Sequence, residues 1–116
     1  MKVVYIAGPF RAATAWQVER NIRAAEEQIL YVAEMGASAL CPHTNTRFLD
    51  GTMTGEYWLA ATLELMRRCD AVLLVGDWEK SAGTRGEVAE ADALGMPVFA
   101  SRSDLALWIA SDASSQ

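Results

Sequence analysis

The stretch VVYIAGP, residues 3–9, is a short apolar run that ends in a turn. Its β-branched residues favour a strand, and an unbroken apolar run is typical of a strand that is covered on both faces of a parallel sheet. Gly8 and Pro9 follow directly and end the strand. The chain therefore opens with a buried strand, Val3 to Ala7, that leads into a turn at its carboxyl end.

Helical and strand patterns alternate along the rest of the chain. The capping pattern TAWQ, residues 14–17, predicts a helix whose apolar residues recur at helical spacing until Gly36. A long polar stretch, residues 43–55, is predicted to be a loop. The other predicted elements are strands at 38–42, 71–75 and 97–100, and helices at 57–68 (with Leu59, Leu63 and Met66 inward), at 87–94, and from a Ser103 cap through Ile109.

This alternation predicts an α/β fold. We expect one domain over residues 1–111, built as a doubly wound, flavodoxin- or Rossmann-like parallel sheet of four to five strands with helices on both faces. Residues 112–116 are expected to be a frayed C-terminal tail.

The composition is that of a small globular protein, with 52% hydrophobic and 22% charged residues among 116. Membrane helices need roughly 20 apolar residues in a row, and signal peptides begin with a basic and then an apolar stretch. The sequence shows neither pattern and therefore predicts a cytoplasmic protein without a membrane partner. A net charge of −5 argues against a nucleic-acid polymer as partner. Cys41 and Cys69 show no metal-ligand spacing, and neither a metal nor a cofactor is predicted.

Polar residues follow the predicted strands where each strand ends. Because the carboxyl ends of parallel strands share one rim, and doubly wound sheets bind ligands there, these residues are site candidates. They are Gly8, Pro9, Phe10, Arg11, His43, Thr44, Asn45, Asp77, Trp78, Ser81, Gly83, Thr84 and Glu87. Structural explanations also exist: Thr84 and Glu87 form a T-x-x-E capping box, His43 can satisfy a loop carbonyl, and Trp78 can cover the sheet edge.

The stretch SAGTRGE, residues 81–87, indicates an anion site. A helix N-terminus offers unpaired N–H groups and a positive dipole end, to which Ser81 adds a hydroxyl and Arg11 a charge. The Walker and G-x-G-x-x-G motifs are missing, which disfavours nucleoside triphosphates and dinucleotides. With no serine elbow, Cys–His pair or metal cluster evident, a carboxylate is the best candidate nucleophile. A carboxylate at a helix start, as Glu87 is expected to be, is held ionised.

Three segments together resemble the nucleoside 2-deoxyribosyltransferase-like superfamily, and most closely a small bacterial and phage branch of it. They are YIAGP at 5–9, CDAVLLVGDWEKSAGTRGE at 69–87 and ALGMPVF at 93–99, joined by CPHTNTRF at 41–48. The superfamily includes the 2′-deoxynucleoside 5′-phosphate N-hydrolases. The resemblance implies that Glu87 attacks the anomeric carbon and forms a ribosyl-enzyme ester, as retaining glycosidases do, with Tyr5 nearby.

The resemblance also implies how a nucleotide is held. Ser81 stands where the transferases carry an aspartate and the nucleotide hydrolases a phosphate-binding serine, and Arg11 matches an arginine that contacts the 5′-phosphate. Trp78 is placed to stack on a base. The remaining expected substrate contacts are Gly8, Pro9, His43, Asn45, Thr62, Asp77 and Gly83.

One position departs from the family pattern. Thr62 stands where the family carries an aspartate that contacts the sugar and assists proton transfer, and a threonine cannot act as an acid near neutral pH. Glu64 or Asp77 would have to substitute, and the turn of the helix points Glu64 elsewhere.

The sequence thus favours an N-glycosidase that releases the base from a (deoxy)nucleoside 5′-monophosphate. Base exchange between deoxynucleosides and a non-catalytic nucleotide-binding or sensor module stay open as alternatives. A more distant one is a phosphoribohydrolase, because GTRGE at 83–87 resembles a motif of the cytokinin-activating enzymes. The family, together with the large apolar share, also predicts a homodimer or a larger homo-oligomer.

Overall fold

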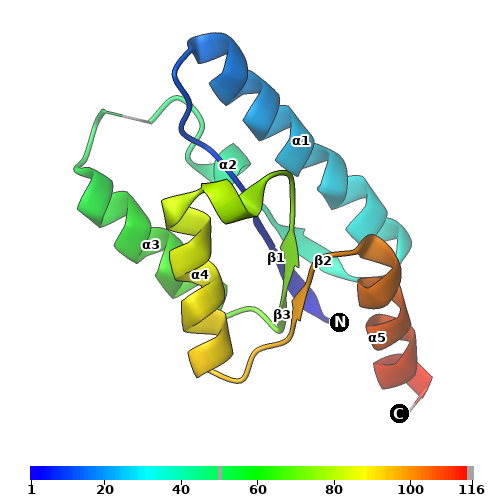
Figure 1. Ribbon diagram of the computed structural model, residues 1–116. Helices are drawn as coiled ribbons and strands as arrows, with labels where there is room; N and C mark the ends of the chain where they lie inside the picture. Colours follow the sequence, from blue (N-terminus) through cyan, green and yellow to red (C-terminus); the bar gives the residue numbers. More distant parts are fainter. Residues whose placement is uncertain (50, 115–116) are drawn as a thin grey trace.

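The computed structural model describes residues 1–49 and 51–114 (Figure 1). The strands are β1 (Val3–Ala7), β2 (Ser38–Leu40), β3 (Ala71–Leu74) and β4 (Val98–Phe99). The helices are α1 (Ala15–Glu34), α2 (Pro42–Asn45), α3 (Gly55–Arg67), α4 (Ala82–Ala93) and α5 (Arg102–Ser114), and a 3-10 turn, η1, spans Trp78–Lys80. None of the helices in this part of the chain is long and apolar enough to cross a membrane.

The four strands form one parallel sheet in the order β2-β1-β3-β4. The chain places β2 on one side of β1 and then crosses over to place β3 and β4 on the other side. The direction of winding therefore reverses between β1 and β3. Figure 1 shows α1 and α5 on one face of the sheet and α3 and α4 on the other, which confirms the predicted fold class.

The central strand β1 divides the core into two halves because its side chains alternate between the two faces of the sheet. Val4 and Ile6 are fully buried in a cluster with side chains from α1 and α5. Tyr5 and Ala7 are fully buried in a second cluster, with side chains from α3 and α4. Tyr5 is thus a polar residue fixed in the core on the α4 side of the sheet.

Helix α4 begins earlier than the sequence predicts. Ser81 is its N-cap, and the Ser81 hydroxyl oxygen accepts a hydrogen bond from the Thr84 backbone N–H at 3.2 Å. The predicted capping box of Thr84 and Glu87 is therefore wrong, and Glu87 lies in the second turn of the helix. The glycines at 83 and 86 are typical of a loop, but the Ser81 cap stabilises an earlier helix start, and both glycines lie within α4.

Helix α5 also differs from its prediction at both ends. It begins at Arg102, where the Ser101 hydroxyl accepts from the Asp104 backbone N–H at 3.1 Å, so Ser101 rather than Ser103 provides the cap. It continues through Ser114 and so includes residues 112–114, which were predicted as part of a frayed tail. Residues 115–116 of that tail lie outside the described residues.

The predicted loop after β2 starts with the short helix α2. Pro42 occupies its first turn, where a missing N–H costs nothing, and His43 is buried with 5% of its surface exposed. The inward placement of Leu59 on α3 is wrong, since Leu59 is 46% exposed, whereas Met66 is fully buried. Cys41 and Cys69 are buried free thiols.

We expect Gly8→Ala to destabilise the fold, because β1 and the segment after β3 approach too closely at this point for a side chain. A Cβ atom at Gly8 would lie 2.8 Å from the Val75 carbonyl oxygen and 3.2 Å from Val75 Cβ. Relieving such overpacking costs roughly 1–3 kcal/mol, which chemical denaturation would measure.

Gly86→Ala is the matched control, because nothing lies within 4 Å of a Cβ placed there. Alanine is the better helix former, so this variant should gain up to about 1 kcal/mol. Equal stability of Gly8→Ala and the parent protein would contradict the close packing at the end of β1.

Candidate active site

A large cavity lies at the carboxyl ends of β1 and β3, where the winding direction reverses. Its volume is about 1020 Å³. This is the position at which doubly wound sheets bind ligands. Twelve of the sequence-predicted site residues line it: Tyr5, Gly8, Pro9, Phe10, Arg11, His43, Thr62, Asp77, Ser81, Gly83, Thr84 and Glu87.

Three predicted residues are not among those that line the cavity. Thr44 and Asn45 lie in α2 and are exposed. Trp78 packs against the core cluster of Tyr5 and borders an adjoining hollow of about 180 Å³ that shares lining residues with the main cavity. Trp58 lines the cavity although it is not among the site residues predicted from the sequence. The available signal was its spacing, since Trp58 precedes Thr62 by four residues and so shares its helix face.

A buried hydrogen bond joins the two residues predicted to be catalytic. The Tyr5 hydroxyl donates to Glu87 Oε2. Tyr5 is wholly inaccessible to solvent and Glu87 is 9% exposed, although both line the cavity. The bond connects the central strand with α4, so the sheet itself fixes the position of the carboxyl group.

Burial dominates the protonation of this pair. It raises the pKa of Glu87 from 4.5 to about 7, against the opposing effect of the hydrogen bond from Tyr5. Burial, and then the nearby Glu87 charge, raise the pKa of Tyr5 far above its usual value, so Tyr5 remains a donor. The expectation that a helix start holds Glu87 ionised is wrong, because the dipole effect fades beyond the first turn.

The N-terminus of α4 also opens on the cavity. The Ser81 hydroxyl oxygen accepts from the Thr84 N–H and from the Thr84 hydroxyl, at 3.2 and 2.9 Å, so its own hydrogen remains for a ligand. Ala82 and Gly83 open the first turn of α4, where backbone N–H groups without a partner inside the helix favour an anion. Arg11 lines the same cavity from the loop after β1.

His43 forms part of the cavity wall near the end of β1. Its Nε2 lies 2.8 Å from the Pro9 carbonyl oxygen, and its ring meets the Phe10 ring edge-on at 5.6 Å. Burial lowers the pKa of His43, so the ring is neutral at pH 7. A carbonyl oxygen only accepts hydrogen bonds, which places the imidazole proton on Nε2.

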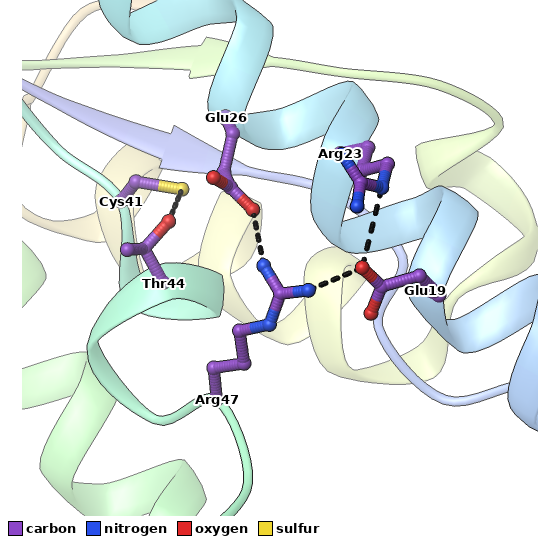
Figure 2. Close-up of polar contacts among 6 residues, drawn as sticks. All are labelled: Glu19, Arg23, Glu26, Cys41, Thr44 and Arg47. Atoms are coloured by element: carbon purple, nitrogen blue, oxygen red, sulfur yellow. Dashed lines mark hydrogen bonds and ion pairs between the residues drawn. The ribbon is translucent and has the colours of Figure 1, made fainter.

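An ion-pair network anchors the segment that carries His43 (Figure 2). Arg47 donates to Glu26 at 2.9 Å and to Glu19, both on α1, and Glu19 also pairs with Arg23 at 3.2 Å. Figure 2 shows the Arg47 side chain extending between the two carboxylates of α1. The network thus ties the chain after α2 to α1 and holds one wall of the cavity.

The site contains carboxyl, hydroxyl, imidazole and guanidinium groups. Within residues 1–49 and 51–114, no three or more His, Cys, Asp or Glu side chains are grouped so as to hold a metal ion.

Comparison with protein families gives one match. Residues 2–101 match the family model described as a domain of unknown function, DUF7768. The chain belongs to this family. No curated protein matches the DUF7768 chain.

Solved structures share the fold of this DUF7768 chain. One is described as a 2-deoxyribosyltransferase from Bacillus psychrosaccharolyticus (TM-score 0.59, 22% identity, 83% of this chain and 69% of that one). Another is described as a 2-desoxiribosyltransferase from Leishmania mexicana (0.60, 22%, 85% and 63%). A third is a conserved protein from Enterococcus faecalis (0.61, 22%, 84% and 61%). The fold is therefore that of the 2-deoxyribosyltransferases, as the sequence resemblance implies, in a chain that spans 61–69% of these proteins.

We expect Glu87→Gln to stabilise the protein more at about pH 8 than at about pH 5. Because burial raises the pKa of Glu87 to about 7, folding favours the protonated carboxyl, and stability is lost as the pH rises from 4.5 through 7. The loss is on the order of 3 kcal/mol. Denaturant unfolding at both pH values measures it.

Glu90→Gln is the control on the same helix, because Glu90 pairs with Arg67 at 2.9 Å and is absent from the cavity wall. Its effect on stability should not follow this pH dependence. An equal difference in stability between Glu87→Gln and the parent at both pH values would show that burial does not govern the protonation of the Glu87 carboxyl.

Proposed function

We propose that the protein is an N-glycosidase that releases the base from a (deoxy)nucleoside 5′-monophosphate, with Glu87 as nucleophile. The observation that carries the proposal is the buried Tyr5–Glu87 hydrogen bond in the wall of the cavity at the β1/β3 reversal. A carboxyl group that is costly to bury and is held by a strand residue is typical of a catalytic group. The fold shared with the 2-deoxyribosyltransferases supports N-glycosidic chemistry.

The phosphate of the substrate would bind at the start of α4. The Ser81 hydroxyl and the N–H groups of the first turn offer donors, and Arg11 adds positive charge on the same cavity. These groups would hold the phosphate by hydrogen bonds and by charge. They favour a nucleotide over a free nucleoside.

The reaction follows the double displacement of retaining glycosidases. An ionised Glu87 oxygen attacks the anomeric carbon, the bond from that carbon to the base nitrogen breaks, and its electron pair leaves with the base. The product is an ester between Glu87 and the sugar. Water then attacks the anomeric carbon, the ester bond breaks, and the Glu87 carboxylate is restored while the water proton passes to solvent or base. Tyr5 orients the carboxylate by donating to Glu87 Oε2.

A specific observation favours a second candidate, a nucleotide-binding module without turnover. Thr62 lines the cavity, and its hydroxyl donates to the Leu59 carbonyl at 3.1 Å. It supplies no acid for the departing base. In this alternative the cavity still binds nucleotides.

Base exchange between deoxynucleosides is a third candidate, supported by the descriptions of two of the structures that share the fold. It needs a free acceptor base. Because its substrates carry no phosphate, it should not depend on Arg11.

The deciding experiment is chromatography of the bases released from a panel of ribo- and deoxyribonucleoside 5′-monophosphates. We expect release by the parent and by Glu90→Gln, and a loss of at least about a thousandfold in Glu87→Gln, since the nucleophile is removed. If the parent protein binds nucleotides without releasing the base, and Thr62→Asp does release it, the binding module is supported. New nucleosides formed only when a free base is added would support exchange.

The pH profile of base release tests the state of the nucleophile. Since burial raises the pKa of Glu87 to about 7 and the ionised form attacks, kcat/KM should rise with pH to a plateau above about pH 7. The Tyr5 hydrogen bond lowers that pKa, so Tyr5→Phe should move the midpoint to higher pH. An unchanged midpoint in Tyr5→Phe would contradict this role for Tyr5.

We also propose that the protein acts as a cytoplasmic homodimer or larger homo-oligomer. Large apolar side chains such as Trp16 and Phe48 are exposed on the single chain, and association would cover some of them. Light scattering of the purified protein tests this, and a monomer at micromolar concentration would contradict it.

A further inference from the structure

Two residues of the cavity wall carry buried polar atoms that no described part of the protein satisfies. They are Nδ1 of His43 and Nε1 of Trp58. Each atom is screened from solvent, so a ligand would reach it only after neighbouring side chains shift. A buried donor or acceptor without a partner weakens a fold, so such atoms are rare and each calls for an explanation.

The hydrogen-bonding roles of the two atoms are opposite. His43 bonds to the Pro9 carbonyl through Nε2, so Nε2 carries the proton and Nδ1 is an acceptor. Trp58 Nε1 is always a donor. The two residues come from α2 and α3, which border the cavity from different elements.

The ligand that suits this wall is planar and has an N–H donor and an acceptor on its edge. Phe10 and Trp58 line the cavity with aromatic rings, which favour stacking with a flat ligand. Nucleobases combine a flat face with ring nitrogens, amino groups and carbonyl oxygens on the edge. Ser81 and the first turn of α4 lie on another element, which leaves the wall around His43 and Trp58 for the base, while Arg11 reaches from the loop after β1 to Gly55 at the start of α3.

We propose that His43 Nδ1 and Trp58 Nε1 recognise the base, His43 by accepting from a base N–H and Trp58 by donating to a base nitrogen or oxygen. This inference rests on the proposed function. It limits the substrates to nucleotides whose base presents both an N–H donor and an acceptor. A base without an N–H donor is disfavoured because it leaves His43 Nδ1 unpaired.

The chain has one histidine, so the nitrogen signals of His43 can be observed by NMR without ambiguity. The experiment titrates the Glu87→Gln protein, which is not expected to turn over, with the same panel of nucleoside monophosphates. We expect a nucleotide that binds to shift the His43 Nδ1 signal toward lower frequency, as hydrogen-bond acceptance does, while Nε2 keeps its proton. It should also shift the Trp58 indole N–H signal, assigned by its loss in Trp58→Phe.

Matched ligands and variants measure the contribution of each contact. The nucleotide that binds best is compared with an analogue whose edge N–H is replaced by C–H or N-methyl, and we expect roughly tenfold weaker binding of the analogue. In His43→Phe this ratio should fall close to one. Trp58→Phe should weaken the binding of both ligands, whereas Trp78→Phe, which alters only the adjoining hollow, should weaken the binding of neither.

The outcomes separate this inference from the proposed function. Nucleotide binding that leaves the His43 Nδ1 signal and the analogue ratio unchanged would overturn base recognition by His43, while the proposed N-glycosidase remains standing. Absence of binding by every nucleotide in the panel would overturn both. If His43→Phe fails to fold, the NMR titration of the chain with His43 intact still decides.

Discussion

The hydrogen bond between Tyr5 and Glu87 is the constraint on which the site depends. It joins residues that are 82 positions apart, one on the central strand and one in the second turn of α4. Tyr5 occupies a core position that an apolar side chain would fill at no electrostatic cost, and Glu87 is buried so deeply that its pKa rises to about 7. The fold therefore retains a carboxyl group in an unfavourable place, which is the compromise that active sites show.

The parallel sheet supports that pair. Close contact of the chain at Gly8 with Val75 brings the segments after β1 and β3 together at the reversal, and α4 starts nearby with its Ser81 cap. Arg47 fixes the opposite wall by pairing with Glu19 and Glu26 of α1. A carboxyl group, the start of α4 and an aromatic wall thereby surround one cavity.

Local sequence patterns were sufficient for the fold and for much of the site. The apolar run before Gly8 and the alternation of strands and helices predicted the sheet, and the strand ends predicted Arg11, Ser81 and Glu87 in one place. Local patterns failed where competing signals or distant packing decide. Both Ser81 and Thr84 can cap a helix, and burial rather than the helix start governs Glu87. Which tryptophan reaches the cavity depends on how α3 and η1 pack against the sheet.

The most direct test of the account is a search for the covalent intermediate. Protein mixed with a substrate nucleotide is quenched in acid during turnover, digested, and analysed by mass spectrometry. The account predicts a sugar phosphate attached to the peptide that contains Glu87, and none in Glu87→Gln. Base release without any adduct, together with full activity of Glu87→Gln, would contradict it.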